Sequence, residues 1–122
     1  MGVTAELSAF CADIKLSTLP PDVVNRARFL VLDLVGNIVR ARHDAESTAS
    51  FLAATRAMGM ATGNAGVFGD PARYAPAGAA FLNGALAHSL DFDDTHAAGS
   101  LHPGAPVIPA AIAAGEMVGA SG

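Results

Sequence analysis

The residues best suited to chemistry lie in the stretch HSLDFDDTH, residues 88–96, where three carboxylates fall within four positions and a histidine stands at each end. Side chains of these types act as general acids and bases and as metal ligands. Carboxylates so close together repel one another unless a proton, a metal ion or a cationic side chain lies between them. From Tyr74 to Gly122 the sequence has no Lys and no Arg. The nearby candidates for positive charge are His88, His96 and His102. Three outcomes are therefore open: water solvates the acids, a metal binds them, or cationic side chains come from another part of the protein.

Two details favour a reactive site over an acidic helix end in solvent, which is the alternative without chemistry. The segment before the cluster is almost wholly apolar or small. The segment after it, GSLHPGAPVIP at residues 99–109, is rich in Gly and Pro and carries His102. Loops of this kind on a helical frame often hold functional side chains.

Two further kinds of chemistry fit the same residues. Asp91, Asp94, His88 and His102 have the side-chain types that bind divalent metals, although no metal signature such as His-Glu-x-x-His is present. The string DFDDT also matches the Asp-x-Asp-Asp-Thr sequence of class II terpene cyclases, in which a protonated middle Asp begins carbocation chemistry. Those enzymes surround the motif with aromatic rings that stabilise cations, whereas this chain has six Phe, one Tyr and no Trp.

Helical spacing of apolar residues accounts for most of the chain, which we predict to be all-α. The Gly-rich segment 59–70 is expected to be a loop with a short extended piece at Val67-Phe68. The expected helices run from a Thr4 cap to about Ile14, from Pro20-Pro21 to about Arg42, over Ala45–Met58, from Pro76 to about Leu90, and from Pro106 or Val107 to Val118.

The placement of the acids depends on where the fourth of these helices ends. If it continues through residue 95, His88, Asp91 and Thr95 share one face at i, i+3 and i+7. Asp94 then lies near that face, and Asp93 points away from it.

The composition indicates a surface that is covered by more protein. Hydrophobic residues make up 52% of the 122 residues and charged residues 15%, against usual values of about 45–50% and about 25%. A high content of Ala and Gly is the simpler alternative. The net charge of −4 provides no basic footprint for nucleic acid or an anionic membrane.

Three features of the sequence favour a cytoplasmic protein. The most apolar run, residues 29–39, is far short of the ~20 residues that span a bilayer. The start MGVTAELSAF lacks the basic and apolar parts of a signal peptide. Cys11 is the only cysteine, so no internal disulfide can form, which fits a reducing compartment.

Longer stretches resemble the MmgE/PrpD family, which includes 2-methylcitrate dehydratase, cis-aconitate decarboxylase and iminodisuccinate epimerase. The resemblance is carried by LNGALAHSLDFDDTH at 82–96 and HPGAPVIPAAIAAGE at 102–116. It extends to LPPDVVNRARFLVLDLVGNIV at 19–39 and GVFGDPARYAPAGAAFLNG at 66–84. These segments cover most of the chain.

The resemblance implies a large helical domain, a smaller α/β lid domain and an active site between them, usually in a homodimer. Residues 1–122 would form the N-terminal part of the helical domain, without the lid. The implied reaction is proton transfer next to a carboxylate of a di- or tricarboxylic acid, with loss of water or CO2 in a 2-methylcitrate dehydratase-like lyase. Neither a metal nor another cofactor is expected.

The resemblance also implies roles for individual residues. The family's active-site Asp, Thr and loop His fall on Asp91, Thr95 and His102, which are the expected catalytic residues. The gap between Thr95 and His102 is one residue longer than in the decarboxylase branch, so His96 is an alternative. The residues expected to bind substrate are His96, Asp94 and His88.

Members of the family are several times longer than this chain. Their further His, substrate-binding basic residues and acid/base Lys lie beyond its end, and Lys15, the only lysine here, lies in a different segment. We therefore expect a truncated product or one subunit of a split enzyme, completed by a complementary C-terminal chain or assembled as a homo-oligomer. The alternative is a non-catalytic helical interaction module.

Overall fold

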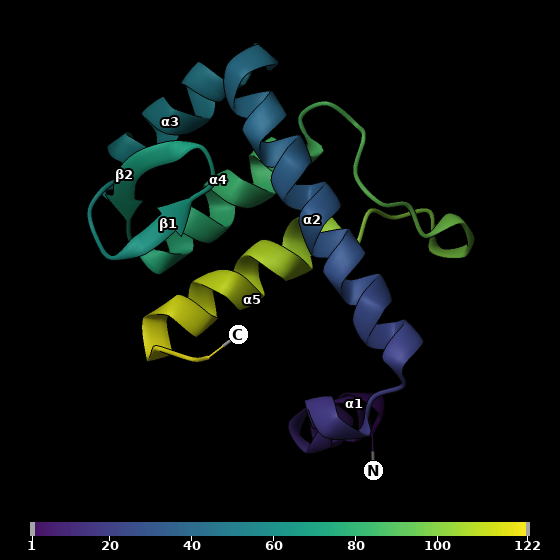
Figure 1. Cartoon of the computed structure of the whole chain (residues 1–122). Coiled ribbons are helices and arrows are strands. Elements are labelled where there is room, and N and C mark those ends of the chain that lie inside the picture. Colours follow the sequence, from purple (N-terminus) through teal and green to yellow (C-terminus); the bar gives the residue numbers. More distant parts are fainter. Residues whose placement is uncertain (1, 122) are drawn as a thin grey trace.

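The computed structural model describes residues 2–121, which are mostly helical as predicted (Figure 1). The expected partial domain over residues 1–122 also includes Met1 and Gly122, which lie outside the described residues, so its bounds stay a prediction. The helices are α1 (Val3–Asp13), α2 (Pro21–Asp44), α3 (Thr48–Ala57), α4 (Pro76–His88) and α5 (Gly104–Val118); the strands are β1 (Ala65–Val67) and β2 (Asp70–Tyr74); and short 3₁₀ turns lie at Leu16–Thr18 and Ala97–Gly99.

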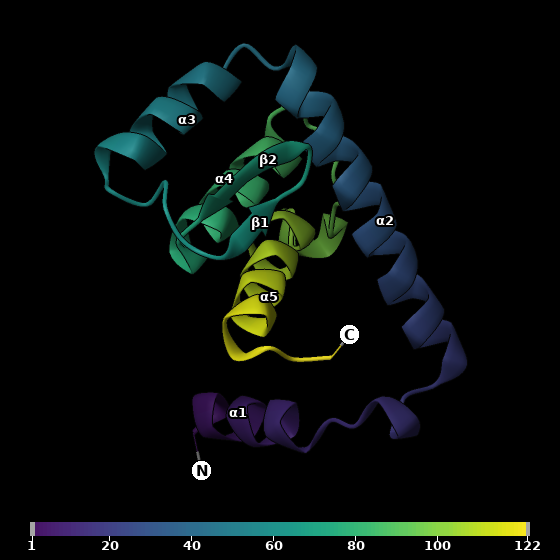
Figure 2. The ribbon, with the colours of Figure 1, turned by 60° about the vertical axis from the view of Figure 1, so that its left-hand side comes forward.

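Helix α4 lies at the centre of the core. It contacts α2, α3, α5 and both strands, and Figure 2 shows it behind the hairpin, between α3 and α2. Leu82 and Leu86 are almost completely buried there. A Cβ at Gly84 would lie 2.9 Å from the carbonyl oxygen of Ala105, so the glycine allows α5 to approach α4 closely.

The strands β1 and β2 form an antiparallel hairpin, which the sequence predicted only in part. The extended piece expected at Val67-Phe68 overlaps the end of β1, and β2 was missed. Strand β2 begins with Asp70 and Pro71, two residue types that are uncommon in strands. Its formation therefore depends on contacts with the helices rather than on local preference.

Asn83 of α4 holds β1, the partner strand of β2, and the turn that follows it. Its side chain is buried, and its Oδ1 accepts a hydrogen bond from the backbone N–H of Phe68 at 3.0 Å. Its Nδ2 donates to the carbonyl oxygen of Gly66, also at 3.0 Å. Both ends of the amide are thus used to hold the hairpin on α4.

Asp70 joins the hairpin to α2. Its carboxylate pairs with Arg42 at 2.9 Å and accepts hydrogen bonds from the Tyr74 hydroxyl at 3.0 Å and the Ala72 N–H at 2.9 Å. Burial opposes ionisation of Asp70, but the hydrogen bonds and the Arg42 charge outweigh it and lower the pKa of this carboxyl. Burial, together with Asp70, raises the pKa of Tyr74.

Several predicted helix ends are wrong by a few residues. Helix α1 follows Gly2 and has no side-chain cap, so Thr4 does not cap it. Helix α3 begins at Thr48 instead of Ala45, and α5 begins at Gly104, before the expected Pro106. Helix α4 ends at His88 rather than near Leu90.

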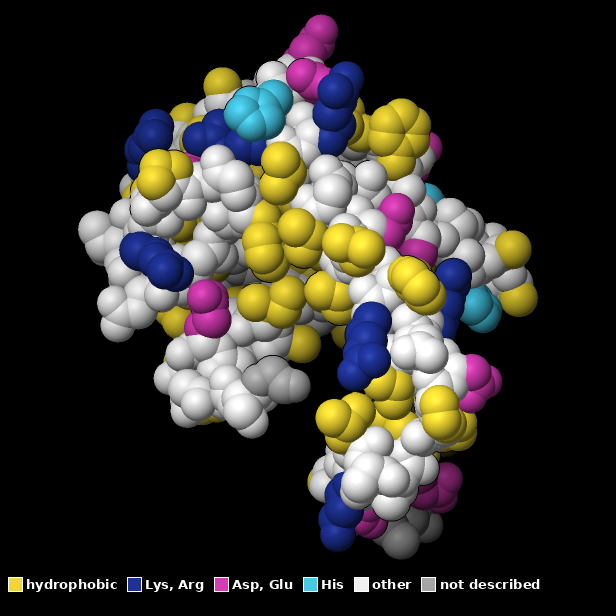
Figure 3. Space-filling model, viewed as in Figure 1, with side chains coloured by type: hydrophobic (Ala, Val, Ile, Leu, Met, Phe, Trp, Pro, Cys, Tyr) yellow, Lys and Arg dark blue, Asp and Glu magenta, His cyan; other side chains and the backbone are white. Residues whose placement is uncertain are grey.

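Helix α1 stands apart from the other helices in both ribbon views (Figures 1 and 2). None of its residues is buried, and the apolar side chains of Leu7, Phe10 and, directly after the helix, Ile14 are exposed. Exposed apolar side chains also lie along α2, including Phe29 and Leu32. Figure 3 shows hydrophobic side chains gathered over α2 and on the part of the molecule that projects downward and ends in α1.

Among the described helices, none combines the length and apolar character needed to cross a bilayer.

Candidate functional site

The chain turns sharply directly after α4. The backbone N–H of Asp91 donates to the carbonyl oxygen of His88 at 3.1 Å, and Asp91 has a φ of 55°. This left-handed conformation is uncommon outside Gly but tolerated by Asp and Asn. Helix α4 therefore does not continue through residue 95, and the face that His88, Asp91 and Thr95 would share under that condition does not form.

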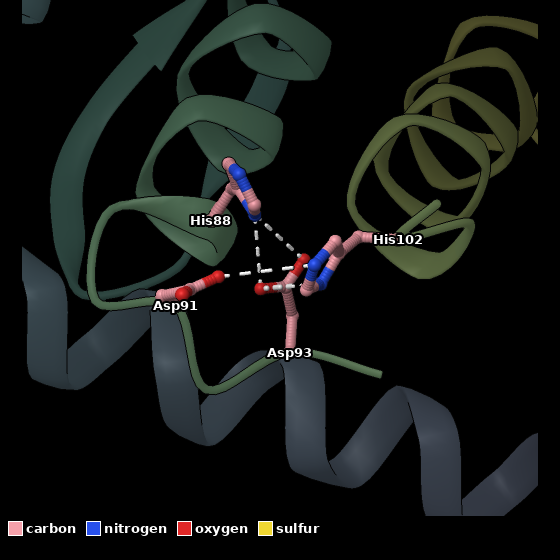
Figure 4. A group of neighbouring side chains, drawn as sticks. All are labelled: His88, Asp91, Asp93 and His102. Carbon is pink, nitrogen blue, oxygen red and sulfur yellow. Dashed lines mark hydrogen bonds and ion pairs between the residues drawn. The ribbon is translucent and has the colours of Figure 1, made fainter. Parts of the chain in front are cut away.

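The turn brings Asp93, which would point away if the helix continued through residue 95, into the middle of a cluster with two histidines (Figure 4). The Asp93 side chain is 0% exposed. Its Oδ1 and Oδ2 lie 3.0 and 3.1 Å from Nδ1 of His88. Oδ1 also lies 3.4 Å from Nδ1 of His102. No periodic pattern in the sequence predicts this contact, because residues 89–103 between α4 and α5 contain no α-helix and no strand.

His102 lies between two carboxylates. Its Nε2 is 3.8 Å from Oδ1 of Asp91, whose side chain is 80% exposed. Its Nδ1 is buried and, among the described residues, has no partner at good hydrogen-bond geometry, although Asp93 is within ion-pair distance. The rings of His102 and His88 meet edge to face, with centroids 4.8 Å apart. The structure thus brings together His88, Asp91 and His102 of the predicted residues and adds Asp93.

The other three predicted site residues lie outside this cluster. Asp94 accepts a hydrogen bond from the backbone N–H of Gly104 at 2.9 Å, at the start of α5. Thr95 is exposed. His96 is also exposed, and its Nδ1 accepts from the backbone N–H of Gly99 at 3.0 Å within a small loop closed against Leu101. Their predicted roles in catalysis and substrate binding stay predictions.

The histidines of the cluster border a groove between α4 and α5. The groove has a volume of about 540 Å³ and is open to the surface. Its wall is almost entirely apolar apart from the two imidazoles. The lining residues are Ala80, Phe81, Gly84, Ala85, His88, His102, Ala105 and Pro106. A bound molecule would therefore meet apolar walls and a titratable end, as in many small-molecule sites.

The cluster's acids have only histidines as charged partners within residues 2–121. The arginines in ion pairs join Asp44, Asp70 and Glu116 instead. Imidazoles and carboxylates in contact can accept and release protons. The ligand atoms of His88, Asp91, Asp93 and His102 also lie within 4.8 Å of one another, so they could hold a divalent ion. This set differs from the sequence-based metal alternative by Asp93 in place of Asp94.

Comparison with known proteins supports the resemblance. The model of the MmgE/PrpD N-terminal domain matches residues 5–122. The chain belongs to the MmgE/PrpD family. No solved structure matches the chain significantly.

Curated relatives of this MmgE/PrpD chain include proteins from fungi and human. The chain is 35% identical to the cis-aconitate decarboxylase-like protein oryM of Aspergillus oryzae over 94% of its own length and 23% of the relative's. It is 31% identical to the cis-aconitate decarboxylase of Aspergillus terreus over 99% of its length and 24% of the relative's. For the human cis-aconitate decarboxylase the values are 32%, 95% and 24%. The chain thus spans about a quarter of the length of these relatives.

Proposed function

We propose that this chain supplies one wall of the active site of an MmgE/PrpD-type lyase acting on a small di- or tricarboxylic acid. The observation that carries the proposal is the contact of His102 with Asp91 and Asp93 beside the groove between α4 and α5. The relatives named as cis-aconitate decarboxylases favour loss of CO2. Loss of water from 2-methylcitrate is the second reaction to assay.

His102 and Asp91 are the residues proposed to move protons. In decarboxylation, the bond between carbon and the leaving carboxylate breaks, its electron pair stays on carbon, and an acid of the site protonates that carbon. In dehydration, a base of the site removes a proton next to a carboxylate while hydroxide leaves with a proton from an acid. An imidazole and a carboxyl group within 3.8 Å of each other can supply the acid for decarboxylation, or the base and the acid for dehydration. Thr95 would donate a hydrogen bond to a substrate oxygen.

The proposal requires positive charge from another part of the protein. A wall with Asp91, Asp93 and Asp94 repels a substrate that carries two or three carboxylates of its own. The rest of an MmgE/PrpD polypeptide, on the same or a separate chain, is proposed to supply the basic residues and to cover α1 and α2. The exposed apolar side chains of these helices support this covering.

A chimeric enzyme tests the proposal. This chain's residues 5–122 would replace the matching quarter of the Aspergillus terreus cis-aconitate decarboxylase, and release of CO2 from cis-aconitate would be measured. We expect an active chimera whose rate falls about 100-fold or more in His102→Gln and Asp91→Asn, because acid–base groups contribute about 10²–10⁴-fold. His43→Gln, an exposed histidine of α2, is the matched control and should keep full activity.

Two results would contradict the proposal. One is a chimera whose His102→Gln and Asp91→Asn variants are as active as the parent chimera. The other is a chimera with the parent enzyme's oligomeric state and melting behaviour that is inert toward both cis-aconitate and 2-methylcitrate. That second result, with stable assembly, would instead favour the non-catalytic interaction module.

A further inference from the structure

We infer that Asp93 is a positioning residue that fixes the tautomer and orientation of both His88 and His102, so that His102 presents Nε2 as its proton-exchanging atom. Among the sequence patterns, only the terpene cyclase alternative gave Asp93 a role, as its middle Asp, and the family resemblance assigned it none. Its catalytic consequence rests on the proposed lyase function, but its effect on the two rings does not.

The burial of Asp93 demands hydrogen-bond donors. Its side chain is fully buried, and burial of a carboxylate without donors or a counter-charge is strongly unfavourable. In the described part of the chain, it is hydrogen-bonded to Nδ1 of His88 at 3.0 and 3.1 Å. It also lies at ion-pair distance, 3.4 Å, from the buried Nδ1 of His102, which has no other partner there. An ionised carboxylate only accepts hydrogen bonds. Each Nδ1 must therefore carry a proton for these contacts to be favourable.

That requirement decides which nitrogen is free to react. A neutral imidazole has one N–H, so a proton on Nδ1 leaves a lone pair on Nε2. In His102 this lone pair faces Oδ1 of Asp91, 3.8 Å away. Nε2 can then take up a proton and, once protonated, pair with Asp91. A carboxylate that orients a histidine in this way is a recurrent arrangement in catalytic and metal sites.

His96 provides a contrasting reporter within the same chain. Its Nδ1 accepts a hydrogen bond from the backbone N–H of Gly99 at 3.0 Å. Neutral His96 must therefore carry its proton on Nε2, opposite to His88 and His102. Because His96 lies outside the cluster, its tautomer should not respond to changes at Asp93.

NMR of the imidazole nitrogens tests the inference without any enzyme assay. Two-bond ¹H–¹⁵N correlations of the ¹⁵N-labelled chain would be recorded where the rings are neutral. We expect protonated Nδ1 in His88 and His102 and protonated Nε2 in His96. In Asp93→Asn the carboxamide offers one acceptor and one donor group, so it can accept from the nearer His88 while its NH₂ faces His102. We expect His102 to change to the Nε2-protonated form.

Asp91→Asn is the matched control, since it changes the exposed acid and leaves both Nδ1 contacts intact. It should leave the tautomers of His88 and His102 unchanged. A wild-type spectrum with His102 protonated on Nε2 would overturn the inference, and this result needs no variant to fold. A folded Asp93→Asn chain, judged by an unchanged His96 signal, with His102 still protonated on Nδ1 would also overturn it.

The active chimera offers a second readout that depends on the proposed function. There, Asp93→Asn should lower kcat at least tenfold with little change in KM, because it alters the reacting nitrogen rather than substrate contacts. If the NMR prediction holds and the chimera is inactive, the lyase proposal fails while the positioning role stands.

Discussion

The carboxylate of Asp94 accepts a hydrogen bond from the backbone N–H of Gly104 at 2.9 Å, and this contact ties the acidic loop to the start of α5. The bond satisfies one of the free N–H groups at a helix N-terminus. A Cβ at Gly104 would clash with the Asp94 carboxylate, so the contact needs glycine. The contact therefore holds together the two ends of the segment 94–104, which carries His102.

Removal of this contact should destabilise the chain measurably. Asp94→Ala is expected to lower the free energy of unfolding by about 1 kcal/mol, the usual value of a side-chain cap, while Asp94→Asn should retain most of it. Urea unfolding followed by circular dichroism would measure the change. Asp13→Ala, at the exposed end of α1, is the control. An Asp94→Ala chain as stable as wild type would show that the cap contributes nothing.

Asn83 should matter for stability rather than chemistry. Asn83→Ala leaves the N–H of Phe68 and the carbonyl of Gly66 without their side-chain partner, which should cost about 2–4 kcal/mol. Hydrogen exchange at the Phe68 amide should become faster. Asn64→Ala, an exposed change beside the same hairpin, should have little effect. Unchanged protection of Phe68 in Asn83→Ala would contradict the assigned contact.

Acid should weaken the chain through Asp70. The pKa of this carboxyl is lowered on folding. Its contribution to the free energy of unfolding is therefore fully present above the unfolded-state pKa of about 3.9. The contribution is lost as the pH falls through the lower folded-state pKa. Unfolding free energies measured from pH 6 down to about pH 2 should decline less steeply in Asp70→Asn than in wild type. Parallel pH profiles for the two proteins would exclude this role.

The exposed face of α1 should contribute little to the stability of the isolated chain. Leu7→Ser and Phe10→Ser are expected to change the unfolding free energy by less than about 0.5 kcal/mol, because both side chains are more than half exposed. Leu82→Ala in the core should cost about 2–5 kcal/mol. In the chimera, the same α1 substitutions should reduce yield or assembly if the rest of the polypeptide covers this face. A large loss of stability in the isolated chain would mean that α1 packs on it.

The sequence by itself determined the helical character of the chain. Apolar spacing repeats every three to four residues in the helices, and Pro at the first turn of α2 and α4 marks their starts. It also selected three members of the candidate site, because residue type and the family resemblance both pointed to His88, Asp91 and His102. These are local properties, and they do not depend on how the segments pack.

Only the tertiary structure decided which acid faces the histidines. The choice between Asp93 and Asp94 depends on a left-handed residue at Asp91 and on the separation between the ends of α4 and α5. Strand β2 is a similar case, since Arg42 of α2 pairs with its first residue, Asp70, and Asn83 of α4 holds β1 and the turn between the strands. In a loop, a change of φ and ψ at one residue redirects every side chain that follows. No periodic pattern in the sequence predicts such a change, because packing between distant segments determines it.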